Sequence, residues 1–266
     1  MELGSLSVPE AWLPIAFSEF VIKVHSRCDL TCSYCYMYQL ADRALPPGEA
    51  VMSERVFART ADRIAAHAHR HSSKVRVVLH GGEPLLAGVT RLASMATSLR
   101  SALYPTEPQI SLQTNGVLLD GAGIDRLAAH GINIGLSLDG DRSANDRHRR
   151  YANGRSSFDA VDRSARLLAD RPHAFAGILC VVDVRNDPLA TYEALLSYRP
   201  PLLDFLLPHA NWDSEPWRER PEQYGDWLVT IFDAWYSAAV RPTRVRLFEE
   251  LIHLILVVRA APSHSG

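Results

Sequence analysis

The sequence predicts an α/β protein built as a partial (β/α)6 barrel or an open parallel sheet, followed by a helical appendix. Between residue 20 and about residue 208, short apolar runs alternate with longer stretches of helical periodicity, which is the pattern of repeated βα units. Six such units are too few for a closed eight-stranded barrel. After residue 210 only helical patterns remain, which predicts the appendix.

The six predicted strands are short and almost wholly apolar, as parallel strands covered on both faces should be. They lie at residues 20–25, 75–80, 109–113, 133–138, 174–182 and 202–207. Amphipathic helices are expected between them, at residues 53–69 with Ser53 as N-cap, 89–103, 124–130, 158–168 and 189–196. Right-handed crossovers bring the carboxyl ends of all strands to one edge, where we expect the chemistry.

The chain divides into three predicted parts. Residues 1–19 form an N-terminal extension, residues 20–212 the partial barrel, and residues 213–266 the appendix, with helices at 224–236 and 245–258.

Length, composition and charge exclude several classes of protein. A chain of 266 residues can bury a full core without disulfides, and its net charge of -2 argues against a dedicated nucleic-acid binder. The N-terminus lacks the basic and apolar regions of a secretory signal. The apolar stretch at 251–258 is interrupted by His253 and is far shorter than a membrane span of ~20 residues. We therefore expect a cytoplasmic protein without a membrane or nucleic-acid partner.

Three of the four cysteines crowd into one loop after the first strand. Cys28, Cys32 and Cys35 have the spacing CxxxCxxC. Three thiolates can hold three irons of a 4Fe–4S cluster and leave the fourth iron open to a small molecule. The alternative is a structural zinc site, which needs a fourth ligand such as Cys180 or His25.

Other polar and small residues follow the later strands. Gly81, Gly82, Glu83 and Pro84 come after the second strand, Asn115 after the third and Asp139 after the fourth. Taken alone, the second-strand segment also fits the start of a helix, with Glu83 interacting with the helix dipole.

The cysteine spacing, with Tyr34 before the last cysteine, and the segment Gly-Gly-Glu-Pro at 81–84 resemble the two main motifs of the radical S-adenosylmethionine (SAM) enzymes. The resemblance implies a partial barrel that holds one 4Fe–4S cluster and SAM. Cys28, Cys32 and Cys35 would ligate the cluster. Gly81 and Gly82 would let the backbone approach the methionine end of SAM, and the Glu83 carboxylate would accept hydrogen bonds from its ammonium.

Further segments at 114–116, 137–140 and 145–149 resemble the peptide-modifying branch whose members carry a C-terminal SPASM domain. This resemblance implies that Ser137 and Arg149 hold the SAM carboxylate, that Asn115 lies near the ribose or the methionine end, and that Tyr34 flanks the adenine. The simpler interpretations are a turn at Asn115, a strand-end hydroxyl at Ser137 and a solvated arginine face.

The segments at 23–30, 78–86, 145–151 and 204–209 resemble the maturases of the FxSxx peptide systems, which belong to or neighbour the enzymes that form three-residue cyclophanes. The resemblance implies a carbon–carbon bond between an aromatic ring and a nearby β-carbon of a ribosomal precursor peptide. It also implies a reducing partner such as a flavodoxin or ferredoxin. Asp139, His80 and His209 are the candidate bases for the last proton.

One departure from these relatives leaves alternatives open. The chain ends at Gly266, before a SPASM region, and Cys180 is its only spare cysteine, so the appendix is expected to be a linker toward an absent SPASM domain. A side-chain oxidation of the sulfatase-maturase kind, or a truncated cluster-binding protein without catalysis, are the two alternatives to crosslink formation.

Overall fold

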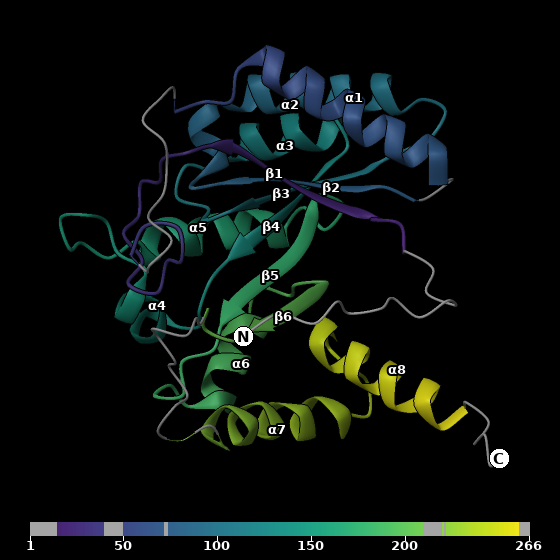
Figure 1. The fold of residues 1–266 in the computed structure, drawn as a ribbon. Coiled ribbons are helices and arrows are strands. Elements are labelled where there is room, and N and C mark those ends of the chain that lie inside the picture. The colour runs from purple at the N-terminus through teal and green to yellow at the C-terminus, as the bar shows by residue number, and fades with distance from the viewer. Residues whose placement is uncertain (1–14, 40–49, 72–73, 210–219, 221, 261–266) are drawn as a thin grey trace, which may run out of the picture.

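A computed structural model describes residues 15–39, 50–71, 74–209, 220 and 222–260. Seven parallel strands form one open sheet whose spatial order follows the sequence (Figure 1). The first six confirm the predicted strands and the open, partial-barrel class. The strands are β1 (Glu19–His25), β2 (Arg76–Gly81), β3 (Gln109–Thr114), β4 (Ile132–Ser137), β5 (Phe175–Val181), β6 (Leu202–Leu206) and β7 (Arg244–Val245).

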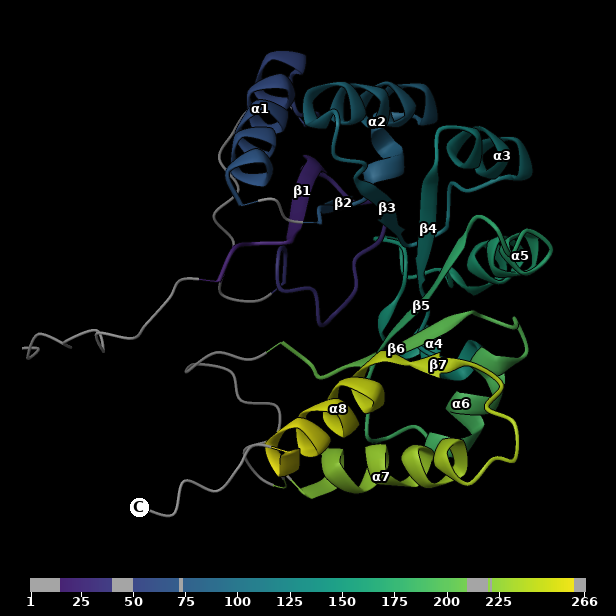
Figure 2. The ribbon, with the colours of Figure 1, turned by 90° about the vertical axis from the view of Figure 1, so that its right-hand side faces the viewer.

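Helices cover the outer side of the curved sheet, as Figure 2 shows for α1, α2, α3, α5 and α6. The bounds are α1 (Glu54–His71), η1 (Pro84–Ala87), α2 (Val89–Leu103), α3 (Gly121–Ala129), α4 (Arg142–His148), α5 (Phe158–Ala169), α6 (Pro188–Leu196), α7 (Glu222–Tyr236) and α8 (Arg246–Ala260). The short helix α4 was not predicted as a helix. None of the described helices is both long and apolar enough to cross a membrane.

Side-chain oxygens fix where several helices begin. The carboxylates of Asp120, Asp141 and Asp187 each accept a backbone hydrogen bond from the third residue that follows, and the predicted N-cap Ser53 does the same at 3.3 Å. Pro188 occupies the first turn of α6, where backbone N–H groups have no intrahelical acceptor, so the N–H that proline lacks is not needed.

The strands bury one face more completely than the other, which corrects the expectation of strands buried on both faces. Val77 and Leu79 of β2 are fully buried in the core shared with the outer helices. Alternate positions, among them Lys23 and His80, leave this core and line the concave face, where Gln113 lies half-buried. The sheet therefore presents an open face with polar side chains, of the kind that can receive a substrate.

The C-terminal helices are joined to the sheet by an unpredicted strand. β7 pairs with β6, and Trp235 of α7 is fully buried and donates its indole N–H to the Thr243 carbonyl at 2.9 Å. Rings from β6, α7 and α8 meet, since Phe205 lies 5.5 Å from Trp227 and 6.2 Å from Phe248 between ring centroids. The predicted boundary between residues 212 and 213 lies outside the described residues, and the division into domains stays a prediction.

Candidate cofactor site

The loops that follow the first four strands meet at one edge of the sheet, as expected from the topology. The backbone N–H groups of Gly82 and Glu83 donate to the carbonyls of His25 and Arg27, each at 2.8 Å, which ties the loop after β2 to the loop after β1. The Asn115 side-chain amide donates to the Asp29 carboxylate at 2.6 Å and so adds the loop after β3.

The cysteine loop is held in place by the segment that ends α4. The Thr31 N–H donates to the Arg150 carbonyl at 2.8 Å, and the Ser33 N–H donates to the His148 carbonyl at 3.3 Å. Cys28, Cys32 and Cys35 are half-buried free thiols. Burial raises the pKa of Cys28 to about 12, so metal binding must displace its proton.

The arrangement fits a cluster better than a single zinc ion. Within the described ranges, no three His, Cys, Asp or Glu side chains converge on one ion, whereas each iron of a cluster needs only one thiolate. The two residues predicted as a possible fourth zinc ligand have other surroundings. Cys180 is 1% exposed in the core of β5, and the His25 ring accepts a hydrogen bond from the Arg27 N–H at 3.1 Å.

Glu83 is fully buried, and its carboxylate is occupied by the protein itself. One oxygen accepts from the Leu85 N–H at 2.9 Å and from the Thr114 hydroxyl at 2.7 Å, while the other accepts from the Asn115 N–H at 2.8 Å. Burial raises its pKa to about 7 against these hydrogen bonds. The carboxylate therefore joins the loops after β2 and β3 and caps η1, which is the simpler interpretation that the sequence left open.

The two glycines are needed because another backbone passes directly over them. A side-chain carbon at Gly81 would collide with the His25 carbonyl, and one at Gly82 would collide with the Arg27 carbonyl and the Tyr38 hydroxyl. These contacts pack the second motif against the backbone of residues 25–27, which leads into Cys28. They give the glycine pair a structural reason that does not depend on SAM.

A buried polar chain lies behind the cysteine loop. The Tyr34 hydroxyl donates to the Asp139 carboxylate at 2.5 Å and accepts from the Arg149 guanidinium at 3.0 Å, and the other Asp139 oxygen accepts from the Val181 N–H at 3.0 Å. Arg149 is 5% exposed, and its Nε has no hydrogen-bond partner among the described residues. That N–H remains available for an acceptor such as a cofactor carboxylate.

The remaining predicted SAM contacts lie at the same edge. Ser137 ends β4 and accepts a hydrogen bond from Gln113 at 2.9 Å. The Asn115 amide also lies 3.7 Å from the Cys28 sulfur, so it faces the cysteine loop. The roles toward SAM stay predictions for all the expected contacts, which are Tyr34, Gly81, Gly82, Glu83, Asn115, Ser137 and Arg149.

The three candidate bases differ in their surroundings. Asp139 is 2% exposed and engaged by Tyr34, and its burial raises its pKa. His80 is half-buried at the end of β2, where burial lowers its pKa. His209 is exposed, with its ring 5.1 Å from the Tyr36 ring. Of the three, the histidines have the open surroundings that a group exchanging protons with a substrate requires.

Sequence reasoning missed a second polar chain beside the cysteines. The His148 ring bonds the Ser33 hydroxyl at 2.5 Å through Nδ1 and the Asp183 carboxylate at 3.1 Å through Nε2, and it packs 5.0 Å from the Tyr34 ring. Burial opposes the ionisation of Asp183, but hydrogen bonds from Arg185 hold its pKa below the usual range. Only the presence of His148 in the segment 145–149 could have drawn attention to it.

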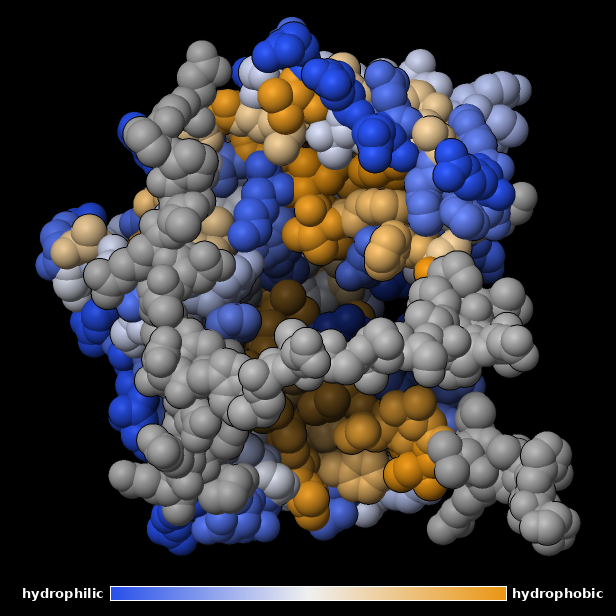
Figure 3. Space-filling view, viewed as in Figure 1, coloured by the Kyte–Doolittle hydropathy of each residue, from blue (hydrophilic) through white to orange (hydrophobic). Residues whose placement is uncertain are grey.

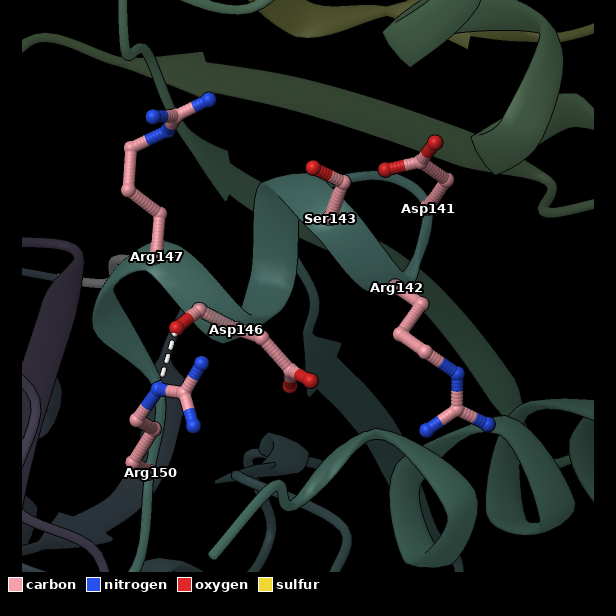
Figure 4. Close-up of a pocket in the computed structure, with 6 residues that line it drawn as sticks. All are labelled: Asp141, Arg142, Ser143, Asp146, Arg147 and Arg150. Atoms are coloured by element: carbon pink, nitrogen blue, oxygen red, sulfur yellow. Dashed lines mark hydrogen bonds between the residues drawn. The ribbon is translucent and has the colours of Figure 1, made fainter. Parts of the chain in front are cut away.

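A surface hollow of about 560 Å³ is lined by residues of α4 and the segments directly before and after it (Figure 4). Arg150 bonds the carbonyls of Asp146 and Gly154, and Arg147 pairs with Asp183 at 3.1 Å. The lining residues are Asp141, Arg142, Ser143, Asp146, Arg147 and Arg150.

Comparison with protein families supports the same interpretation. The family model "Radical SAM superfamily" matches residues 22–188. The cysteine-type anaerobic sulfatase-maturating enzyme of Clostridium perfringens strain 13 is 28% identical over 247 residues, which cover 89% of this chain and 65% of that relative. The serine-type enzyme of Klebsiella aerogenes is 30% identical over 84% of this chain and 55% of its own length.

Solved structures agree with these relatives. Native anSMEcpe with bound AdoMet and the Cp18Cys peptide superposes with a TM-score of 0.76 at 26% identity, over 90% of this chain and 66% of that one. The histidine-tagged form with bound AdoMet gives a TM-score of 0.77 at 25% identity, over 91% and 66%. This chain therefore spans between 55% and 66% of the length of these relatives.

Proposed function

The chain belongs to the radical SAM superfamily and is an oxidoreductase-type enzyme that uses a 4Fe–4S cluster and SAM, and we propose that it modifies a side chain within a peptide substrate. The observation that carries the proposal is similarity along 89% of the chain to a sulfatase-maturating enzyme, together with the peptide bound in a structure of similar fold.

When bound and reduced, the cluster with SAM supplies a 5′-deoxyadenosyl radical that takes one hydrogen atom from the substrate. The chain's own residues would hold these groups. Cys28, Cys32 and Cys35 provide three thiolates, and Arg149 offers its unpartnered Nε beside them. Glu83 and Asn115 keep the surrounding loops in register, and the concave face of the sheet receives the peptide.

Side-chain oxidation without a crosslink is the outcome that the relatives favour. The sulfatase-maturating enzymes align along most of the chain, and none of the relatives described above is a cyclophane-forming maturase. The FxSxx-like segments favour a carbon–carbon crosslink as the second candidate. A crosslink and the oxidation of a hydroxyl side chain each remove two hydrogens from the peptide, so the total mass cannot separate them. One would leave as the hydrogen atom that the radical takes, and the other as a proton and an electron that the oxidised cluster or its electron carrier would accept.

The test incubates reconstituted, reduced chain with SAM and candidate precursor peptides without oxygen. We expect 5′-deoxyadenosine and a peptide that has lost two hydrogens. Fragmentation between the modified residues distinguishes the products, because a crosslinked ring resists it, while an oxidised side chain fragments normally and reacts with a carbonyl reagent. Formation of 5′-deoxyadenosine without any change in any peptide would contradict the proposal.

Metal content tests the cofactor ligands separately from the substrate. We expect about four irons and four sulfides per chain, because one loop supplies three thiolates. Cys32→Ala should lose most of both, whereas Cys180→Ala should retain them, since Cys180 lies in the core of β5. Zinc without sulfide in the parent chain would contradict the assignment.

We propose that an acidic one-electron carrier, such as a flavodoxin or ferredoxin, docks on the arginines over α4. Arg150 and Arg155 are exposed, and neither has a carboxylate within ion-pair distance among the described residues. The Arg150 carbonyl also accepts from Thr31 inside the cysteine loop. Such a surface steers an acidic partner toward the cluster. The carrier and the three free thiols suit a reducing compartment, so we place the protein in the cytoplasm.

The docking surface is tested by reversing its charge. Arg150→Glu with Arg155→Glu should slow cluster reduction by a flavodoxin about tenfold at low salt and leave reduction by dithionite unchanged. The matched control, Arg55→Glu with Arg59→Glu, reverses two exposed arginines on α1 and should change neither rate. Equal flavodoxin rates in both variants would remove the surface from the proposal.

A further inference from the structure

The concave face of the sheet carries an ammonium group that no described acidic residue neutralises. Lys23 of β1 is exposed, and among the described residues its side chain makes neither an ion pair nor a hydrogen bond. Its neighbours Ile22 and Val24 are buried on the opposite face, so the alternation of the strand turns Lys23 toward the open side.

Three further side chains gather around this ammonium from different segments. His80 is the register partner of Lys23 on β2. The ammonium lies 5.3 Å from the centre of the Tyr36 ring, and that ring lies 5.1 Å from the His209 ring. His80 Nδ1 lies 2.7 Å from the Gly81 amide nitrogen and 2.9 Å from the Gly81 carbonyl oxygen, so the backbone of Gly81 holds the ring in place. The group therefore offers hydrogen-bond donors and aromatic surface.

Nearby acids are committed to other partners. Glu19 lies four residues before Lys23 on the same face of β1 and forms an ion pair with Arg76 at 3.0 Å. Asp204 binds Arg246 at 2.9 Å. Asp139 is buried against Tyr34. An ammonium beside an aromatic ring and a histidine, with no acid of its own among the described residues, is a site for an anion.

We propose that Lys23, with His80 and Tyr36, binds a carboxylate of the peptide substrate, either an acidic side chain or a free C-terminus. The inference deepens the proposed function and rests on it. The other carboxylate that enters this edge belongs to SAM. The buried Arg149, with its unpartnered Nε behind the cysteine loop, is a separate cation available for it, which leaves Lys23 to the peptide.

The chain contains only two lysines, Lys23 and Lys74, so chemical labelling can report on this site directly. Lys74 is exposed just before β2 and serves as the internal reference. The full chain, reconstituted with its cluster, is acylated with limiting acetic anhydride, and the ratio of labelled Lys23 to labelled Lys74 is read by mass spectrometry. The probes are N-acetyl-Ser-Phe-Ser-Gly-Asp with a free C-terminus, its Asn analogue, and the amidated forms of both.

At about 1 mM peptide we expect the carboxylate probes to lower the Lys23 to Lys74 ratio severalfold, and the Asn, amidated probe to leave it unchanged. Protection by only one of the two acidic forms identifies the side chain or the C-terminus as the ligand. Equal ratios with all four probes overturn the proposal. Protection by SAM alone, with no further effect of acidic peptide, assigns Lys23 to the cofactor and also overturns it.

Substitution gives a second measurement. Lys23→Gln should raise the concentration of acidic peptide needed for half-maximal modification about tenfold and leave that of an amidated peptide unchanged, with Lys23→Arg restoring most of the affinity. Lys74→Gln is the matched control and should behave as the parent chain. Because labelling needs no turnover, an inactive chain whose Lys23 is still protected would contradict the proposed function and leave this site standing.

Discussion

At the scale of single residues, Glu83 shows how burial changes a role. The resemblance implies that it accepts hydrogen bonds from the SAM ammonium, which stays a prediction, and in the structure its carboxylate accepts hydrogen bonds from Leu85, Thr114 and Asn115. A carboxylate with no exposed surface and three protein donors is a structural joint between the loops after β2 and β3.

Glu83→Ala should therefore destabilise the whole fold as well as weaken cofactor binding. Removing the carboxylate leaves the N–H groups of Leu85 and Asn115 buried without their acceptor, which should lower the free energy of unfolding by about 3 kcal/mol. Urea titration of the metal-free chain measures this. Glu107→Ala removes a carboxylate that is 82% exposed and should cost less than about 0.5 kcal/mol. Equal midpoints for the two variants would contradict the structural role.

The same residue should make stability depend on pH. Burial raises the Glu83 pKa from 4.5 to about 7, so between these values the folded chain holds a proton that the unfolded chain has released. Its contribution to the free energy of unfolding is complete below pH 4.5 and is lost as the pH rises to about 7, by about 3 kcal/mol in total. Glu83→Gln cannot titrate at this position, so its free energy of unfolding should lack this decrease between pH 4.5 and about 7. Parallel pH profiles of the free energy of unfolding for the parent and the variant would contradict this role of Glu83.

At the scale of elements, the cysteine loop depends on close packing against the start of η1. The Arg27 carbonyl and the Tyr38 hydroxyl occupy the space that a side chain at Gly82 would need. The loop is also fixed from its other side by the backbone of residues 148 and 150. Its geometry is set by two neighbours that are distant in sequence.

Gly82→Ala should push the loop away and lower both stability and iron content. We expect a loss of about 2 kcal/mol in the free energy of unfolding and less than half of the parent's iron after reconstitution. Gly225→Ala is the control, because its site in α7 is exposed with open space around it, and it should stabilise the chain by up to ~1 kcal/mol. Full iron content in Gly82→Ala would contradict this prediction and show that the cysteine loop accommodates the added side chain.

At the scale of the whole molecule, the C-terminal helices share a core with the sheet. Trp235 of α7 lies 5.6 Å from Phe248 of α8 between ring centroids, and Phe248 in turn contacts Phe205 of β6. Figure 3 shows apolar surface over the lower part of the molecule, and exposed apolar side chains of α8 include Leu251, Leu254, Ile255 and Leu256. We expect the sheet and these helices to unfold together.

Trp235→Ala should destabilise the molecule as one unit. The loss of a fully buried indole should cost about 4 kcal/mol, and circular dichroism and tryptophan fluorescence should report a single coincident transition. Tyr236→Ala alters the neighbouring residue, which is 54% exposed, and should cost under about 1 kcal/mol. Two separate transitions would instead support an independent C-terminal domain.

The sequence by itself determined the order of the first six strands, the edge at which their loops meet and the cysteine loop that defines the cofactor. These features follow from local periodicity and from the handedness of βα units, both of which are visible along the chain. The two-residue strand β7 escaped this reasoning, because so short a segment has no periodicity and is defined only by its partner β6.

The tertiary structure alone decided what the polar side chains do. Glu83 meets Asn115, Tyr34 meets Asp139, and His148 meets Ser33 across 32, 105 and 115 residues of sequence. A hydrogen-bond partner and the burial that shifts a pKa are properties of the packed interior, where these segments first come together. The open polar face around Lys23 is likewise set by the curvature of the sheet, which covers one face with helices and leaves the other exposed.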